Sequence, residues 1–177
     1  MGERYKMNLR TIMIFPDFEN IEEIDKIRNK YDPLAKLVRP HITIVFPFDI
    51  EMINDDLSQI LDTRLNGIEP FEIELQGFSK CQDRFGNYLF LELTKGADDI
   101  TKIHDALYSN EFHICDIGLQ YIPHITVGKV SDVEALNNAY EDIKDNKCRF
   151  VSLINKISVE MIGENEESII IIEKYLC

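Results

Sequence analysis

The chain has 177 residues, of which 45% are hydrophobic and 29% charged, and its formal net charge is −13. This size and composition suit one packed domain, so we expect residues 1–177 to form a single unit with two lobes. A chain this acidic repels long RNA or DNA unless its basic residues cluster, which predicts no long nucleic-acid partner.

The sequence also lacks the usual signs of export, membrane insertion or redox chemistry. No apolar run approaches the ~20 residues of a membrane span, and the run at 11–15 is too short for the core of a signal peptide. The four cysteines are scattered without a Cys-x-x-Cys pair, which predicts neither a zinc knuckle nor a redox pair. We therefore expect a cytoplasmic monomer with reduced thiols and no membrane partner.

In the first half of the chain, apolar periodicity predicts strands and helices in alternation. The expected elements are a strand at 10–15, a helix at 21–31, a strand at 41–46, a helix at about 55–65 and a strand at 71–75. Asp17 or Asn20 can cap the first helix, and Asp32-Pro33 ends it. A hairpin tip at 83–87 then leads into a returning strand at 88–93.

The second half repeats this order. We expect a helix at about 98–109, a strand at 124–129, a helix from about 133, and closing strands at about 150–161 and 168–175. Ser131-Asp132-Val133-Glu134 has the form of a capping box for the second of these helices. The order predicts a repeat, with a first copy at about 8–80 and a second at about 88–177. No linker separates the copies, so we expect an α+β fold with mainly antiparallel sheets, whose two lobes share strands and one cleft.

A five-residue motif occurs twice in the chain. Pro40-His41-Ile42-Thr43-Ile44 is matched by Pro123-His124-Ile125-Thr126-Val127, 83 residues later. The chain has only four histidines, and two of them lie in this one context. A single His-x-Thr would be a chance occurrence, but two copies in a chain of this length indicate a duplicated half-site.

Strand alternation gives each motif a polar face and an apolar face. In the first copy His41 and Thr43 share one face, and Ile42 and Ile44 share the other, where they can anchor the strand in the core. The second copy repeats this pattern. The prolines fit strand entrances, because they cannot donate to a hydrogen-bond ladder.

Two such motifs that face each other can perform acid–base chemistry on a phosphate. Imidazole titrates near pH 6.5, so one ring can take a proton from water or a ribose hydroxyl while the other protonates the leaving oxygen. Each transfer is typically worth about 10²–10⁴ in rate. The hydroxyls of Thr43 and Thr126 can donate to non-bridging phosphate oxygens. Threonine is a poor metal ligand and no carboxylate repeats at a fixed offset, so we expect no metal. The alternative is a structural role for both histidines, with their rings satisfied by backbone groups.

At these residues the sequence resembles the 2H phosphoesterase superfamily, which includes 2′-5′ RNA ligases and 2′,3′-cyclic nucleotide phosphodiesterases. Its signature is a pair of His-x-Thr/Ser-x motifs, and both His41–Ile44 and His124–Val127 match it. The resemblance extends to the repeat and covers most of the chain. Tyr31-Asp32-Pro33 and Val127-Gly128-Lys129 look closest to a bacterial branch of small phosphoesterases.

The resemblance implies a bilobal, pseudo-twofold fold with an antiparallel sheet in each lobe, helices packed outside and both motifs lining a central cleft. It implies no cofactor, and it implies hydrolysis of cyclic phosphates or reversible joining of RNA ends through a 2′-5′ bond. It favours His41 as the acid for ring opening to a 2′-phosphate, although the residues alone leave the roles of the two histidines open. Phe46 and Phe48 follow the first motif where family members often carry an aromatic that stacks on a base, and Lys129 stands where many carry a basic residue.

Strand alternation argues against these three flanking contacts. Counted from the histidines, Phe46 and Phe48 face the core unless a bulge shifts the register, and Lys129 needs a similar break. Arg39 has the parity to contact a phosphate, and a solvated charge at the rim is an equal alternative. His104 and His113 have no partner motif, so we expect them to pack or to lie at the surface.

We therefore expect a metal-independent phosphodiesterase that acts on a small nucleotide or on the phosphate of an RNA end. Two alternatives stay open. One is a nucleotide-binding module without turnover, and the other is a 2′-5′ RNA end ligase, which needs a basic path beside the site.

Overall fold

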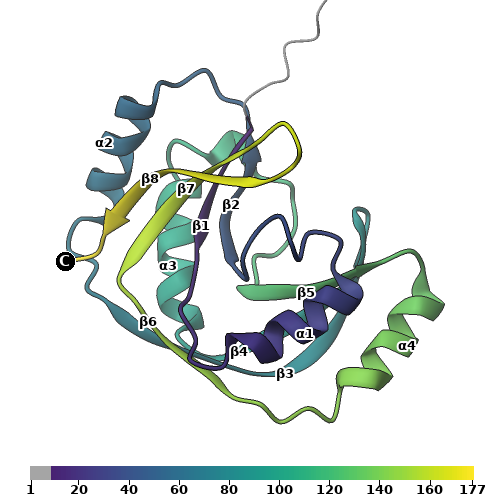
Figure 1. Cartoon of the computed structure of the whole chain (residues 1–177). Coiled ribbons are helices and arrows are strands. Elements are labelled where there is room, and N and C mark those ends of the chain that lie inside the picture. Colours follow the sequence, from purple (N-terminus) through teal and green to yellow (C-terminus); the bar gives the residue numbers. More distant parts are fainter. Residues whose placement is uncertain (1–8) are drawn as a thin grey trace, which may run out of the picture.

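The computed structural model describes residues 9–177, which form two four-stranded sheets and four α-helices (Figure 1). The strands are β1 (Arg10–Ile14), β2 (Ile42–Phe48), β3 (Phe71–Asp83), β4 (Gly86–Lys95), β5 (His124–Val130), β6 (Phe150–Ile154), β7 (Lys156–Ile162) and β8 (Ser168–Tyr175). The helices are α1 (Ile21–Tyr31), α2 (Asn54–Leu65), α3 (Ala97–Tyr108) and α4 (Val133–Ile143), with a 3-10 turn at His113–Cys115.

The strand pairs in this part of the chain are all antiparallel. The first sheet has the order β2-β1-β7-β8, and the second has the order β5-β4-β3-β6. The first sheet thus combines strands from both ends of the chain, and the α+β class expected from the sequence is confirmed. The repeat boundaries near residues 80 and 88 stay a prediction, and residue 8, where we expect the first copy to begin, lies outside the described residues.

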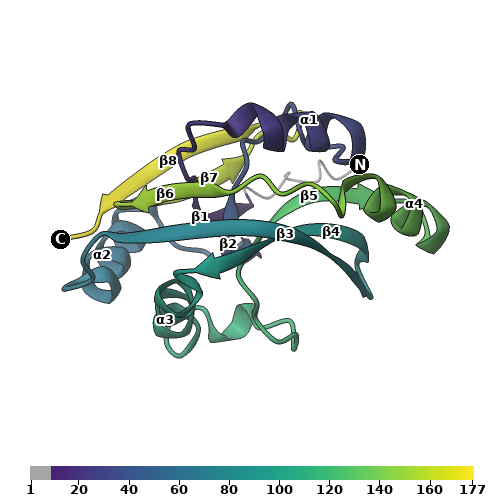
Figure 2. The same cartoon turned by 90° about the horizontal axis from the view of Figure 1, so that it is seen from below.

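The helices that precede the motif strands cross from one sheet to the other. α1 connects β1 to β2 of the first sheet but packs on β5 of the second, and α3 connects β4 to β5 but packs on β2. α2 packs on β8, and α4 packs on β3 and β4. Figure 2 shows α1 and α3 on opposite sides of the molecule. Because α1 and α3 each pack on a strand of the other sheet, they join the two lobes of the pseudo-twofold arrangement. Within residues 9–177, no helix has the length and apolar character to cross a bilayer.

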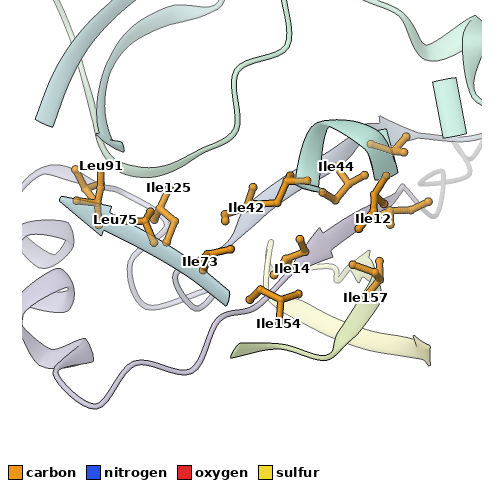
Figure 3. Close-up of a cluster of buried hydrophobic side chains, with 14 of the residues drawn as sticks. Ile12, Ile14, Ile42, Ile44, Ile73, Leu75, Leu91, Ile125, Ile154 and Ile157 are labelled. Carbon is orange, nitrogen blue, oxygen red and sulfur yellow. The ribbon is translucent and has the colours of Figure 1, made fainter. Parts of the chain in front are cut away.

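A single connected cluster of apolar side chains forms most of the core. Figure 3 shows part of it, with contributions from both sheets: Ile12, Ile14, Ile42, Ile44, Ile73, Leu75, Leu91, Ile125, Ile154 and Ile157. Each of these side chains is 2% exposed or less. Burial of one such side chain contributes about 1.5–3 kcal/mol relative to full exposure. The apolar faces of the motif strands are therefore fixed by the core.

The strand expected at 150–161 is wrong in one respect, because it consists of two strands that belong to different sheets. β6 pairs with β3, whereas β7 pairs with β1, and Asn155 separates them. The Asn155 carbonyl accepts a hydrogen bond of 2.9 Å from the backbone N–H of Leu176. Periodicity does not reveal this crossing, since both segments form strands and a single residue lies between them.

The start of α4 also differs from the expected capping box. Asp132, not Ser131, is the cap, and its Oδ1 accepts a hydrogen bond of 2.8 Å from the backbone N–H of Ala135. The Ser131 hydroxyl donates to the other carboxylate oxygen at 2.7 Å. A carboxylate is a stronger acceptor than a hydroxyl at the positive end of a helix, which explains why Asp132 and not Ser131 caps α4. Before α1, Asn20 makes no side-chain cap bond and donates instead to the carbonyl of Arg149.

Candidate active site

The two motif strands lie side by side where the sheets meet. β2 is an end strand of the first sheet, β5 is an end strand of the second, and the two are in contact (Figure 1). The buried residues Pro40 and Pro123 lead into them. The fold therefore brings together two motifs that are 83 residues apart in the sequence.

The alternation predicted for each motif is present. Ile42 and Ile44 are 0% exposed, as are Ile125 and Val127, and Figure 3 shows the three isoleucines among the core side chains. The polar side chains of the motifs are half-buried instead: His41, Thr43, His124 and Thr126. We call these four residues the two-motif site.

Both imidazoles are anchored in the same way. Nδ1 of His41 donates to the carbonyl oxygen of Arg39 at 2.8 Å, and Nδ1 of His124 donates to the carbonyl oxygen of Ile122 at 2.6 Å. A carbonyl oxygen can only accept, so each Nδ1 carries the hydrogen of this bond. Nε2 of each ring is then an acceptor when the ring is neutral and a donor when it is charged. The two rings thus offer the same nitrogen for proton transfer.

Burial lowers the pKa of both imidazoles. Loss of solvation is the largest cause for each ring, and the hydrogen bond to the carbonyl opposes it. The pKa of His124 falls to about 4, and the charge of His41 is one of the causes. The strands that carry the two rings, β2 and β5, are in contact, so the charge of one ring can act on the other. Both rings are therefore mainly neutral at pH 7 in the unliganded protein.

A β-bulge follows the threonine in each motif strand. The register of β2 against β1 shifts between Thr43 and Val45, and the register of β5 against β4 shifts between Thr126 and Gly128. Each of these two bulges adds one extra residue to its motif strand, which reverses the alternation directly beyond it. Val45 and Gly128 are buried as a result, directly after a residue that is itself buried.

The bulges keep Phe46 and Lys129 out of the core. Phe46 is half-buried and Lys129 is exposed. The Lys129 Nζ lies 5.4 Å from the centroid of the Tyr88 ring. The register break that both candidates need is therefore present, and a contact with substrate stays a prediction for each.

Phe48 lies in the core, so the prediction that it contacts substrate is wrong. Its side chain is 3% exposed. The ring packs edge-on against Phe112 with 5.0 Å between centroids, and the Arg10 guanidinium lies 5.4 Å from its centroid. A second register shift, between Val45 and Phe48, returns this side chain to the core and leaves no ring face for a base.

Arg39 lies at the rim of the two-motif site. Its side chain is 57% exposed, and its guanidinium lies 3.6 Å from the Asp17 carboxylate and 5.0 Å from the centroid of the Phe15 ring. Its carbonyl oxygen holds the His41 ring. The backbone of Arg39 thus has a defined place in the site, while Asp17 balances part of its charge and a phosphate contact stays a prediction.

Sequence reasoning missed Phe90, which stacks on one of the two imidazoles. The rings of Phe90 and His124 have centroids 3.5 Å apart and planes at 22°, whereas Phe15 and His41 are 5.9 Å apart at 55°. Phe90 lies on β4, directly opposite Thr126. The contact follows from the pairing of β4 with β5, which α3 separates in sequence, so no local pattern points to it.

The other groupings in residues 9–177 offer no competing site of this kind. No three His, Cys, Asp or Glu side chains in this part of the chain gather so that they could hold a metal ion. One surface cavity of about 230 Å³ lies between α1 and α4, and another of about 630 Å³ lies along β6. Neither is lined by a residue of the two-motif site, whose chemistry consists of two imidazoles and two hydroxyls.

A family model and a curated relative match the sequence of this chain over most of its length. A family model described as the 2′-5′ RNA ligase superfamily matches residues 16–160, a span that contains both motifs. The protein named "Putative phosphoesterase" in Staphylococcus aureus strain JH1 is 20% identical over 167 residues. That alignment covers 93% of this chain and 96% of the relative.

Solved structures share the fold. TT0787 of Thermus thermophilus has a TM-score of 0.60 at 12% identity, over 95% of this chain and 97% of that one. Escherichia coli LigT in complex with 3′-AMP has a TM-score of 0.56 at 12% identity, over 96% of this chain and 98% of LigT. Both share with this chain an α+β fold, here with two antiparallel sheets. Because the family model spans most of the sequence, the chain belongs to the 2′-5′ RNA ligase superfamily of 2H phosphoesterases.

Proposed function

We propose that the protein is a metal-independent phosphodiesterase that hydrolyses a 2′,3′-cyclic phosphate, or a related nucleotide or RNA end, to a 2′-phosphate. The matched anchoring of the two imidazoles is the observation that carries this proposal. His41 and His124 each bind a carbonyl oxygen through Nδ1 and leave Nε2 for proton transfer. His113 also binds a carbonyl oxygen through Nδ1, but only His41 and His124 do so two residues upstream within a repeated motif, on strands that are in contact. Membership of a phosphoesterase family supports the same class of reaction.

In the proposed step, a water molecule attacks the phosphorus atom of the cyclic phosphate. Nε2 of a neutral histidine takes a proton from this water, while Nε2–H of a charged histidine gives a proton to O3′ as the P–O3′ bond breaks. The product carries its phosphate on O2′, and one ring has gained the proton that the other has lost. The family resemblance favours His41 as the acid and His124 as the base, and the roles exchange when the reaction runs in reverse.

The substrate can supply the charged ring that this step needs. In the unliganded protein, loss of solvation lowers the pKa of both His41 and His124. A phosphate anion between the rings favours their charged forms and raises both pKa values. The charge on one ring lowers the pKa of the other, so a single shared proton gives one acid and one base.

The remaining contacts are assigned by their place on the strands. Thr43 and Thr126 accompany the histidines and would donate their hydroxyls to non-bridging phosphate oxygens. Phe46 and Lys129 lie beyond the bulges, where Phe46 would contact the base and Lys129 the negative charge of the substrate. Arg39 would contact the phosphate from the rim of the site. E. coli LigT has been solved with 3′-AMP, with ATP and with NADP+, which supports a small nucleotide as the ligand class.

The test is turnover in the presence of EDTA. The substrates are the 2′,3′-cyclic mononucleotides of the four bases, a cyclic phosphate of ADP-ribose, and 2′-5′-linked oligonucleotides. We expect a 2′-monophosphate product, separated from the 3′ isomer by chromatography, at a rate that added Mg²⁺ or Zn²⁺ does not raise. Absence of turnover for all of these substrates would refute the phosphodiesterase.

Two other outcomes would redirect the proposal. Calorimetric binding of a nucleoside 2′-monophosphate, with no product from any cyclic substrate after long incubation, would identify a nucleotide-binding module. Joining of an RNA 2′,3′-cyclic phosphate end to a 5′-hydroxyl end would identify a 2′-5′ ligase. The net charge of −13 and the pairing of Arg39 with Asp17 argue against the ligase, which needs a basic path for RNA.

A further inference from the structure

Two tyrosine hydroxyls bind the main chain of β2. The hydroxyl of Tyr121 donates to the carbonyl oxygen of Thr43 at 2.8 Å, and the hydroxyl of Tyr108 accepts from the backbone N–H of Phe46 at 3.3 Å. Among the described residues β2 is an end strand that pairs only with β1, so main-chain groups on its other edge have no strand as hydrogen-bond partner. In the strand that carries half of the site, the Thr43 carbonyl and the Phe46 N–H therefore have side-chain hydroxyls as partners.

We propose that Tyr121 is a positioning residue that fixes the first motif relative to the second. The inference rests on the proposed function, since the relative position matters when both motifs act on one phosphate. Tyr121 stands three residues before His124 in the sequence, and its hydroxyl binds the backbone of Thr43. One side chain therefore links the segment that enters β5 to the main chain of β2.

The ring of Tyr121 is itself held in place. It stacks on His104 with 3.7 Å between centroids and 7° between planes, and Tyr108 stacks on His104 at 4.2 Å and 22°. Two rings that lie so close and so nearly parallel to a third must occupy its opposite faces. The outer rings of this stack supply the two hydroxyls, and Asp105 lies 3.0 Å from Nδ1 of His104. His104 thus packs between two side chains that bind the first motif strand.

The residue that precedes the first motif at the position equivalent to Tyr121 cannot form such a hydrogen bond. Val38, three residues before His41, has no hydroxyl and belongs to a small apolar cluster with Met13 and Phe15. Burial raises the pKa of Tyr121, so its hydroxyl keeps its proton at physiological pH. The Tyr121–Thr43 bond therefore keeps its donor at physiological pH, and it links the two motif strands from one side only.

The substitution Tyr121→Phe tests this role, because it removes the hydroxyl and keeps the ring that stacks on His104. We expect kcat for a 2′,3′-cyclic nucleotide to fall about tenfold with KM changed less than about twofold, since a misplacement of about 1 Å can cost about 10²-fold in rate. The substrate can still bind to one motif, which is why KM changes little.

Tyr31→Phe is the matched control. The Tyr31 hydroxyl donates to Asp142 at 2.7 Å, in a contact between α1 and α4, and its loss should leave kcat unchanged. Tyr108→Phe should have an intermediate effect, because its bond to Phe46 is longer and lies beyond the motif. An equal fall in kcat for Tyr31→Phe and Tyr121→Phe, or a change in KM alone, would overturn the proposal.

A double-mutant comparison identifies the motif through which Tyr121 acts. On a Thr43→Ala background, the loss caused by Tyr121→Phe should shrink, because the hydroxyl that it positions is already absent. On a Thr126→Ala background, the loss should stay at about tenfold. Equal losses on the two backgrounds would contradict a role through the first motif.

A measurement without substrate separates this inference from the reaction. Methyl NMR can follow Ile42 and Ile44 on β2, and in Tyr121→Phe we expect microsecond-to-millisecond exchange that the wild type and Tyr31→Phe lack. If exchange appears although the wild type hydrolyses no cyclic phosphate, the proposed function fails and the positioning role stands. If the wild type is active and Tyr121→Phe changes neither kcat nor exchange, the positioning role fails alone. No activity and no exchange would overturn both.

Discussion

The two motif strands are built alike by their own residues and differently by their neighbours. In both, the carbonyl oxygen two residues upstream holds Nδ1 of the imidazole, and a bulge follows the threonine. The neighbours differ, because Phe90 stacks on His124 at 3.5 Å, whereas Phe15 meets His41 only at 5.9 Å. Tyr121 binds the first strand, and its counterpart in the first copy is a valine.

The repeat therefore presents two alike imidazoles, and their unequal surroundings distinguish one from the other. Besides burial, Arg28 lowers and Asp32 raises the pKa of His41, while the charge that acts on His124 is that of His41. Two identical groups in unequal surroundings can hold one proton unequally, which is what an acid and a base require. The local repeat alone would make the two rings interchangeable.

Loss of either imidazole should lower activity more than any other change. His41→Ala and His124→Ala should each lower kcat for a cyclic nucleotide by about 10²–10⁴, because each removes one proton transfer. His113→Ala is the control, since its Nδ1 also binds a carbonyl oxygen, that of Asn110 at 2.8 Å, and its exposed side chain belongs to neither motif. Steady-state kinetics would show whether both strands contribute. Full activity in either motif variant would mean that the reaction needs only one of them.

Substitutions at Phe46 and Phe48 on β2 should distinguish a loss of stability from a loss of substrate contact. Phe48→Ala should lower the free energy of unfolding by about 3–5 kcal/mol, because it leaves a cavity beside Phe112. Phe46→Ala should cost less, since its ring is only half-buried, and should raise KM instead. Urea denaturation and kinetics on both variants distinguish these effects. A larger stability loss for Phe46→Ala would show that the bulge does not turn this ring away from the core.

The same pair marks the limit of prediction from sequence. The faces of His41–Ile44 follow from strand geometry, so alternation places these residues correctly. Beyond Thr43 the alternation depends on the register of β2 against β1, which shifts twice. Phe46 and Phe48 share a face by sequence count, and the second shift, between Val45 and Phe48, places them on different faces.

Contacts between distant segments are the part that the sequence does not predict. Phe90 reaches the second motif through the pairing of β4 with β5, and Tyr108 reaches the first through the packing of α3 on β2. Tyr121 precedes β5 and binds the main chain of β2. No periodicity encodes which strand lies beside which. The crossing at Asn155 went unforeseen for the same reason, because partner strands in two sheets determine it.

Removal of the Phe90 ring should affect one imidazole and spare the other. In Phe90→Ala, water gains access to His124, so its pKa should rise from about 4 toward the ordinary value, since desolvation is the largest cause of its lowering. The lost attraction between ring and cation acts in the opposite direction and is the smaller effect. The pKa of His41, which has Phe15 as its aromatic neighbour, should change little. NMR titration of the Cε1 protons measures both rings, and equal shifts would show that their surroundings are not separate.

Stability in mild acid should change only slightly with the charge of the two imidazoles. The pKa of both motif histidines is lower in the folded protein than the ordinary 6.5, so the unfolded chain binds more protons below that pH. The free energy of unfolding should therefore fall as the pH drops from 6.5 toward about 4, the folded pKa of His124. At higher pH the rings are neutral in both states and contribute no slope.

Glu160 contributes a pH dependence of the opposite sign, so it has to be replaced before the contribution of the histidines to the free energy of unfolding can be measured. It is 4% exposed, and burial raises its pKa above the ordinary 4.5, so its contribution to stability is lost as the pH rises. Glu160→Gln should therefore steepen the rise in stability between pH 4.5 and 6.5. His124→Gln added to this variant should flatten the rise, whereas His113→Gln should not. Urea denaturation across this range measures the slopes, and an unchanged slope with His124→Gln would mean that the second motif strand does not hold its imidazole neutral.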